Sequence, residues 1–258
     1  MLRRIPRNRP ENWSEERQKT SSRWLRFFHK FEWYCSWAAW ALGNWAFLEV
    51  IESLGTFSVL VAVVFYFADS GNRIKQRHYQ AWQVINTAQG KGGSGGRIEA
   101  LQELNHDKVP LIGVEAASAF LQGINLRGAR LNRCTFQASD LRNSDLANAD
   151  LTFCNLHSAN LRGSNLNRAQ MQDADLTDAD LNGSNLSEAT LARADLTRTD
   201  LRNADLTRID WRQIASFDLA NIWSVRNPPE GFVAFALAHG AVSLASDEDW
   251  AKAEKSGP

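Results

Sequence analysis

The fold of this chain is decided by the stretch NLHSANLRGSNLNRAQMQDADLTDADLNGSNL, residues 155–186. Nearly every fifth residue in it is leucine. From residue 121 to residue 211, all 19 positions of this series are large and apolar, and 16 of them are Leu. An α-helix repeats its faces every 3.6 residues and a β-strand every two, so leucine at strict fives predicts neither element.

A second series of residues lies two positions before each large one. Ten of its 19 members are Ala, four are Ser, two are Cys and one is Thr, while Ile124 and Ile209 are larger. Asp or Asn is frequent between the small and the large residue. If five residues form one side of a square and 20 form one turn, both series point inward. Successive turns then pair at roughly the 4.8 Å spacing of β-strands.

This A(D/N)LXX pattern resembles the pentapeptide-repeat family over residues 109–213. The resemblance implies a mainly β fold, a right-handed quadrilateral β-helix of about five coils. We expect its core to contain stacked leucine columns, one of which is formed by Leu141, Leu161, Leu181 and Leu201. The same wall carries Gly or Asn two residues after each Leu, which predicts type II corners with positive φ there and more mixed turns on the other walls.

Cys134 and Cys154 are 20 residues apart, and both occupy the small inward position. We expect them to stack on adjacent turns as small buried thiols, with a disulfide or a metal site as the alternatives. The chain has three Cys and no evident export signal, which favours a reducing compartment.

Two uncharged apolar runs, residues 34–48 and 53–68, precede the repeat, with Glu49 and Glu52 between them. They predict an α-helical transmembrane hairpin over residues 31–69; the alternative is a soluble hairpin packed against the β-helix. Residues 1–33 contain nine Lys or Arg, and three more follow the second run. The positive-inside rule therefore places both termini and the β-helix in the cytoplasm, beneath an inner or thylakoid-type membrane.

The juxtamembrane helix that follows carries basic and aromatic side chains suited to a lipid surface. We expect contact with membrane lipid through Arg73, Lys75, Arg77, Tyr79 and Trp82, the alternative being a helix that packs on its neighbours. A Gly-rich linker and a helix over residues 97–105 should close the first coil. At the other end, Asn227 should cap a helix that stops at Gly240, and Ser246 should start another.

These features divide the chain into five segments and together resemble membrane-tethered pentapeptide-repeat proteins of bacteria, notably cyanobacteria. The segments are a basic N-terminal segment (1–30), the transmembrane hairpin (31–69), a juxtamembrane helix with linker and N-terminal cap helix (70–108), the β-helix (109–225) and a C-terminal cap of short helices (226–258).

No catalytic, metal-binding or cofactor-binding constellation is expected. The five His lack metal spacing, and the run DADLTDADL lacks the EF-hand pattern. The chain has no net charge, and residues 121–211 hold ten Arg against twelve acids. This balance predicts no nucleic-acid partner and disfavours mimicry of DNA.

An interaction surface is predicted on one wall, where Arg142, Arg162 and Arg202 follow the leucine column and Asn182 interrupts them. They are candidates for binding an anionic partner, and solvated charges are the alternative. The sequence favours a non-enzymatic, membrane-anchored scaffold that displays the β-helix to an unidentified protein partner. The alternative is an oligomeric channel or transport component regulated by the β-helix, and Asn44 in the first span favours homo-oligomers.

Overall fold

The computed structural model describes residues 8–16, 25–43, 46–68, 70–87 and 94–255. The chain forms two compact units, Met1–Arg73 and Ile74–Pro258. The first contains the helices α1 (Trp13–Glu16), α2 (Leu25–Gly43) and α3 (Ala46–Ala68). Helix α4 (Ser70–Thr87) begins in the first unit and continues into the second, which also contains α5 (Arg97–His106), α6 (Phe232–Ala238) and α7 (Asp247–Lys255).

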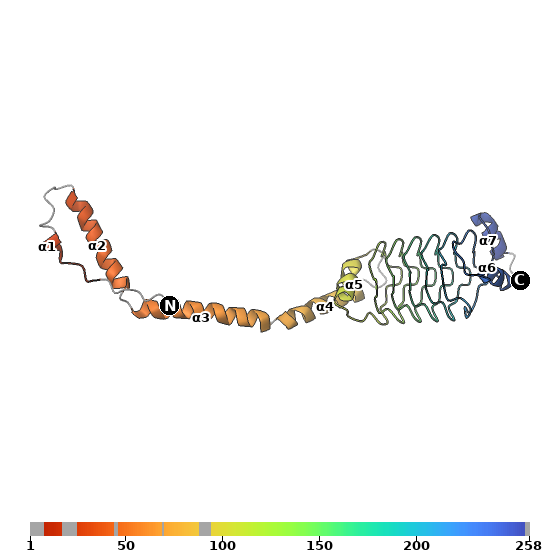
Figure 1. The fold of residues 1–258 in the computed structure, drawn as a ribbon, viewed down its shortest axis with the longest axis horizontal. Helices are drawn as coiled ribbons and strands as arrows, with labels where there is room; N and C mark the ends of the chain where they lie inside the picture. The colour runs from red at the N-terminus through yellow and green to blue at the C-terminus, as the bar shows by residue number, and fades with distance from the viewer. Residues whose placement is uncertain (1–7, 17–24, 44–45, 69, 88–93, 256–258) are drawn as a thin grey trace. The chain divides into compact units, whose positions relative to one another are not determined.

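The second unit is built around a β-helix whose coils follow one another at a 20-residue register (Figure 1). Each side contributes one residue to a parallel bridge, as in Asp140 to Asn160 and Asn160 to Asp180. Main-chain hydrogen bonds link successive coils; the amide of Leu141 donates to the carbonyl of Asn160 at 2.8 Å. The coils therefore satisfy their backbone polar groups in the way that strands of a sheet do.

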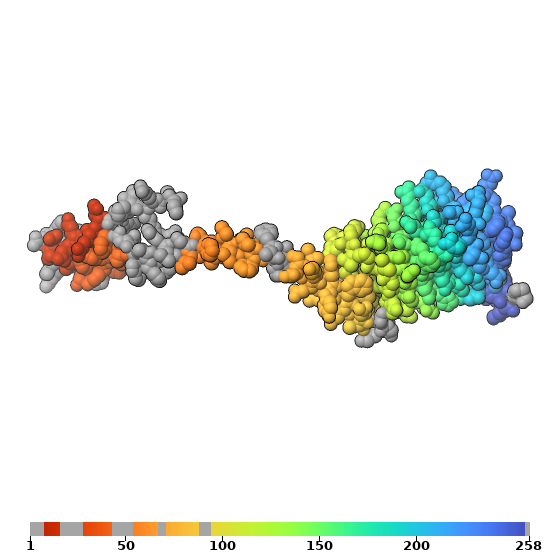
Figure 2. Space-filling model, turned by 90° about the horizontal axis from the view of Figure 1, so that it is seen from below, coloured from red at the N-terminus to blue at the C-terminus, as the bar shows by residue number. Residues whose placement is uncertain are grey.

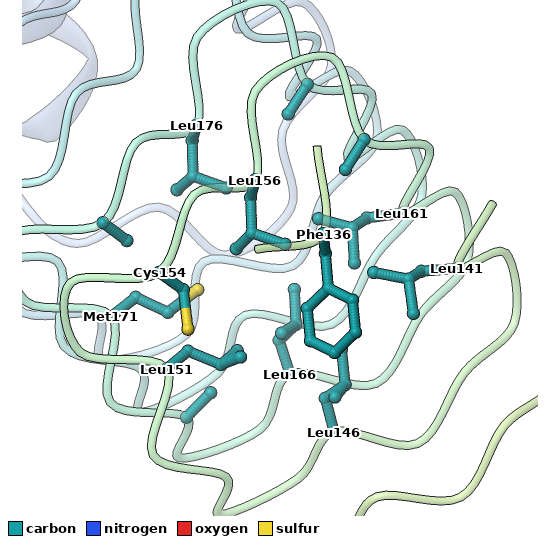
Figure 3. Close-up of a cluster of buried hydrophobic side chains, with 14 of the residues drawn as sticks. Phe136, Leu141, Leu146, Leu151, Cys154, Leu156, Leu161, Leu166, Met171 and Leu176 are labelled. Atoms are coloured by element: carbon teal, nitrogen blue, oxygen red, sulfur yellow. The ribbon is translucent and has the colours of Figure 1, made fainter. Parts of the chain in front are cut away.

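Both five-residue series point into this β-helix, as predicted. Leu141, Leu161 and Leu181 are completely buried, and the small residues Ala159 and Ala179 beside them are buried as well. Figure 3 shows the large side chains stacked on one another inside the coils. The β-helix is thus a close-packed rod, in which apolar burial supplies the main stabilising term.

Corners with positive φ occur on all four walls of the β-helix. Gly163 and Gly183 have φ of 64° and 68°, which confirms the prediction for the wall of Leu161. The expectation of mixed turns elsewhere is wrong, because Phe153, Arg168 and Glu188 on the other walls have φ of 57–59°. Each such residue donates its amide to the next coil, as Arg168 does to Ser187 at 2.9 Å, so the backbone ladder imposes the conformation whatever the side chain.

The β-helix continues beyond the regular part of the sequence. One extra residue lies between Asp210 and Ser216, so the register changes from 20 to 21: Thr190 pairs with Asp210, but Asp195 pairs with Ser216. Phe217, Ala220 and Ile222 then fill the inward positions that the leucine series vacates. The last parallel bridge joins Asn221 to Val242.

The first coil is covered by α5 together with α4. Leu101 and Leu104 of α5 are fully buried, and Ala81 and Ile85 of α4 join the same hydrophobic cluster. His78 of α4 also lies 2.7 Å from Asp107, just after α5. Helix α4 is therefore part of the cap.

The last coil is covered by α6 and α7 (Figure 1). Trp211 and Phe217 of the final coils contact Phe232 with ring centroids 5.7 and 5.8 Å apart. The expected cap at Asn227 is wrong: α6 begins after Gly231, and no side chain caps it. Ser246 does cap α7, because its hydroxyl accepts the amide of Glu248 at 3.1 Å.

A disulfide joins Cys134 to Cys154 inside the β-helix. The two residues stack on adjacent coils as the spacing predicted, but their expected packing as separate thiols is wrong. Their Cα atoms are 4.6 Å apart, because coil-to-coil stacking brings equivalent residues within the range that a disulfide spans. Cys35 is the free cysteine, and it is exposed on α2.

The two apolar runs lie in α2 and α3, and the helix boundary differs from the expected one. Residues 49–53, predicted as the loop between two spans, lie within α3. Helix α2 ends at Gly43 and α3 begins at Ala46. Glycine favours helix termini, whereas residues 49–53 contain no helix breaker. Asn44, the candidate interhelical hydrogen bonder, lies outside the described residues.

Neither of these helices meets the length and hydropathy needed to cross a bilayer by itself, judged over the described residues. The segments Leu54–Tyr66 and Gly71–Thr87, bent by 42° with respect to each other, meet the requirement only in combination.

Candidate interaction surface of the repeat domain

The arginine column lies on the wall whose inward residues are Leu141, Leu161, Leu181 and Leu201. Bridges from Asp140 through Asn160 and Asp180 to Asp200 fix its register, so each following residue stacks on its equivalent one coil away. The structure therefore brings Arg142, Arg162 and Arg202 to one wall, but it gives the three side chains different partners. Figure 2 shows the coils of the domain as a continuous surface that runs from yellow to blue.

Arg142 forms a bidentate pair with Asp140 on its own coil. Its Nε and Nη2 donate to the two carboxylate oxygens at 2.8 and 2.6 Å. The hydrogen bonds from Arg142 lower the pKa of Asp140, and the same bonds raise the pKa of Arg142. Two of the five N–H groups of this guanidinium are therefore engaged within the coil.

Arg162 is held more loosely than Arg142. Its Nη1 lies 3.5 Å from Asp180 on the next coil, and its side chain is 54% exposed. Within the described part of the chain its guanidinium makes no hydrogen bond. Its fork of N–H donors is therefore available to a partner that approaches the wall.

Arg202 is covered by α7 and belongs to the C-terminal cap. It donates to both oxygens of Asp200 at 2.9 and 2.7 Å, and it also pairs with Asp247 at 2.5 Å. Its guanidinium lies 5.5 Å from the ring centroid of Trp250, and only 12% of the side chain is exposed. Hydrogen bonding to Asp200 raises the pKa of Arg202. The expectation that Arg202 lies on an open surface is therefore wrong, and the candidate surface consists of Arg142 and Arg162.

Ion pairs between coils neutralise charges on the other walls. Arg193 pairs with Asp173 and Arg198 with Asp178, each at 2.5 Å, and Arg168 pairs with Glu188 at 2.7 Å. The two partners of each pair are 20 residues apart, and both lie two residues after a large inward residue. Writing the sequence in rows of 20 residues would therefore have placed the two partners in one column and predicted these ion pairs. Such pairs leave the walls charged but locally balanced.

The Asp and Asn residues before each leucine have a structural role that explains their frequency. The Oδ1 atom of Asp175 accepts the amide of Thr177, and that of Asp180 accepts the amide of Asn182, both at 3.0 Å. These bonds occupy amides at the corners that would otherwise lack a protein partner. Over the described residues, no group of three or more His, Cys, Asp or Glu is placed to hold a metal ion.

Asp180 and Asp178 have pKa values shifted in opposite directions, which gives a testable contrast. Burial raises the pKa of Asp180 above 3.8, whereas hydrogen bonding to Arg198 lowers the pKa of Asp178 below 3.8. A carboxyl group whose pKa is raised in the folded state stabilises the fold at low pH, and this contribution is lost as the pH rises through the raised pKa. A carboxyl group whose pKa is lowered stabilises the fold at higher pH, and this contribution is lost as the pH falls through the lowered pKa.

We therefore expect opposite effects from the same substitution at these two positions. Asp180→Asn keeps the Oδ1 acceptor and removes a half-buried charge, so it should raise the free energy of unfolding at pH 7. Asp178→Asn should lower it by about 0.5–1 kcal/mol. Both differences should shrink below pH 3.8, as urea unfolding at pH 7 and pH 3 would measure. Equal destabilisation by both variants at pH 7 would contradict the assigned environments.

The predicted juxtamembrane residues have several different environments. Arg73 donates to the carbonyl of Tyr66 at 2.8 Å, and Arg77 lies 3.6 Å from Glu103 on α5. Lys75 is exposed, and Tyr79 is 73% exposed. Trp82 is partly buried and packs against the core of the second unit, which is the arrangement expected of the alternative, a helix that packs on its neighbours.

The repeat segment matches the family model described as pentapeptide repeats, in eight copies over residues 111–146, 129–168 and 169–208. No curated protein matches the chain. Among solved structures, the pentapeptide repeat protein Rfr23 of the cyanobacterium Cyanothece 51142 is 35% identical, with 34% of this chain and 60% of that chain covered and a TM-score of 0.34. HetL of Nostoc sp. strain PCC 7120, a pentapeptide repeat protein involved in heterocyst differentiation regulation, is 28% identical, with 46% and 56% covered and a TM-score of 0.27.

A pentapeptide repeat protein of the Arabidopsis thaliana thylakoid lumen is 24% identical, with 44% of this chain and 77% of that chain covered and a TM-score of 0.38. The chain thus spans less than two thirds of the length of Rfr23 and HetL. The repeat model matches the coils whose five-residue series and 20-residue register are described above. Residues 111–208 thus form a pentapeptide-repeat domain.

Proposed function

We propose that this protein is a non-enzymatic scaffold, anchored in a membrane by α2 and α3, whose β-helix binds a protein partner through the wall of Arg142 and Arg162. The observation that carries the binding role is the half-exposed guanidinium of Arg162, which has only a 3.5 Å ion pair among the described residues. It stands on a wall whose backbone is fixed by hydrogen bonds at every coil. A rigid surface loses little conformational entropy on binding, which favours association.

The charge pattern of the domain suits a protein partner better than a nucleic acid. Its Arg and acidic residues are nearly balanced, and many are paired between coils. Nucleic-acid binding draws its affinity from a net positive surface, which this domain lacks. Arginine is instead among the residues enriched at the energetic hot spots of protein interfaces.

The proposed anchor is supported by the exposed apolar side chains of α3. Leu54, Phe57, Leu60, Phe65 and Tyr66 are each at least 60% exposed in this unit. A helix that is apolar on all sides is typical of a buried core element or a membrane helix, because water hydrates such a surface poorly. In the described residues no neighbouring element buries these side chains, which favours a lipid environment.

The proposed topology places both termini and the β-helix in the cytoplasm. The nine Lys or Arg of residues 1–33 support it through the positive-inside rule. The Cys134–Cys154 disulfide weighs against it, because disulfides are rare in the cytosol. Cysteine labelling in intact cells would decide whether the β-helix lies in the cytoplasm, as the basic N-terminal segment favours, or on the other side of the membrane, as the disulfide favours.

The binding role is tested by replacing Arg162 with a photo-crosslinking amino acid in the full-length protein in cells. We expect a crosslinked protein partner from this position and none from Asn167, which lies on a neighbouring wall and is engaged with Ser187 at 2.7 Å. Arg162→Ala should reduce co-purification of that partner about tenfold, whereas Arg142→Ala should reduce it less, since Asp140 already holds Arg142. Absence of any protein crosslink, or equal crosslinking from both walls, would reject the proposal.

A further inference from the structure

The first unit contains a cavity of about 510 Å³ that the scaffold role does not use. It is lined by Arg9, Pro10 and Asn12 from the segment around the start of α1, and by Trp33 and Trp37 from α2. Among the described residues that line it, none is acidic, and Arg9 is the charged one. The cavity therefore combines aromatic walls with a positive group.

The walls of this cavity are held together by contacts between the two segments. The Nε1–H of Trp33 donates to the carbonyl of Glu11 at 2.8 Å. The ring of Trp13 lies 5.8 Å from that of Trp33, which in turn lies 6.1 Å from that of Trp37. These contacts fix the chain before α1 against α2, so the cavity exists before any ligand arrives.

Two donors at the cavity have no acceptor within the described residues. The guanidinium of Arg9 lies 5.2 Å from the ring centroid of Trp37, and no hydrogen bond or ion pair from it is found there. The Nε1 atom of Trp37 is shielded from solvent and also lacks a partner among those residues. A buried indole N–H normally has an acceptor, so its absence calls for an explanation.

We infer that this cavity is a binding site for the phosphodiester headgroup of an anionic lipid. The guanidinium of Arg9 matches the geometry and charge of a phosphodiester, and Trp37 supplies a second donor. Phe28, Phe31 and Tyr34 on the same helix are more than half exposed, which provides apolar surface for acyl chains. Indole rings also favour the headgroup level of a bilayer. The inference rests on the proposed membrane anchoring.

The test uses the full-length protein in a neutral detergent and measures binding of short-chain phosphatidylglycerol by native mass spectrometry. Phosphatidylcholine tests the need for net negative charge, and glycerophosphoglycerol, the same headgroup without acyl chains, tests the need for a lipid. We expect phosphatidylglycerol to bind at least tenfold more tightly than either. Arg9→Gln should weaken its binding about tenfold, and Trp37→Phe, which keeps an aromatic ring but removes the donor, should weaken it several-fold.

Lys30→Gln is the matched control, because Lys30 is an exposed basic residue of α2 that does not line the cavity. It should change phosphatidylglycerol binding less than twofold. Equal losses in Arg9→Gln and Lys30→Gln would show general charge attraction and overturn the site. Tight binding of glycerophosphoglycerol would assign the cavity to a free phosphodiester instead of a lipid. Resistance to alkaline carbonate extraction, measured on the same variants, reports anchoring separately from headgroup binding.

Discussion

Leu161→Arg should unfold the repeat domain or destabilise it by more than about 4 kcal/mol. The side chain of Leu161 is completely buried in the middle of a leucine column. A guanidinium at this position would lie among buried leucines on adjacent coils with no acceptor. Because coils above and below depend on this layer, thermal unfolding followed by circular dichroism should show loss of the cooperative transition or a large fall in Tm.

Arg162→Ala is the matched control, since it changes the adjacent residue that points outward. The side chain of Arg162 is 54% exposed, and its ion pair with Asp180 is 3.5 Å long. We expect a change in the free energy of unfolding of less than about 0.5 kcal/mol. Similar losses of stability in the two variants would contradict the assignment of inward and outward positions.

Trp211→Ala should produce the second-largest effect, by opening the C-terminal end of the β-helix. Trp211 is 8% exposed, and its ring lies 5.7 Å from Phe232 and 5.0 Å from Phe235 of α6. Removing it leaves a cavity between the last coils and the cap, at a cost of about 3–5 kcal/mol. Urea unfolding should show the loss, and hydrogen exchange should increase in the last coils before the first ones.

Trp223→Ala controls for the removal of an indole from the same end of the rod. Trp223 is 39% exposed. Its replacement should therefore cost less than about 1 kcal/mol. If Trp223→Ala were as destabilising as Trp211→Ala, the closure of the end would not depend on the aromatic cluster of α6.

The core of the β-helix was predictable because one physical requirement fixes it. A coil of 20 residues must bury the same positions in every turn, so the sequence repeats Leu and a small residue at intervals of five. Leu161 and Ala159 are accordingly buried where the period places them. Nothing distant in sequence is needed to reach this conclusion, since each coil contacts only its neighbours.

The corners were predicted in part because residue preference is only one of the terms that set backbone conformation. Gly163 favours positive φ by itself, whereas Arg168 and Glu188 adopt it at 57° and 59° against their preference. A left-handed residue other than glycine costs about 1–2 kcal/mol, and the hydrogen bonds between coils offset this cost. Residue preference therefore predicted the positive φ at the corners of one wall. Predicting it on the other three walls would have required knowledge of the hydrogen bonds between coils.

The sequence predicted a C-terminal cap of short helices, but it could not predict which wall residues the cap covers, because that depends on contacts across long sequence separations. Arg202 follows its column leucine as Arg162 does, yet it is covered because Asp247 and Trp250 of α7 contact it. The extra residue before Ser216 also shifts the register by one, which hides the last coil from a count in fives. The Cys134–Cys154 pair was predicted to stack, but spacing alone could not distinguish a disulfide from neighbouring thiols.

The central claim, a membrane-anchored β-helix in the cytoplasm, is tested most directly by cysteine labelling in intact cells. Cys35 is replaced by Ser because it is exposed, whereas Cys134 and Cys154 are retained because they are buried and inaccessible to the reagent. Single cysteines are then introduced as Asn44→Cys, between α2 and α3, and as Ser14→Cys and Ser256→Cys near the two ends. The account predicts that a membrane-impermeant thiol reagent labels only the cysteine at position 44, and that alkaline carbonate leaves the protein in the membrane fraction. Labelling at position 14 or 256, or release of the protein by carbonate, would contradict it.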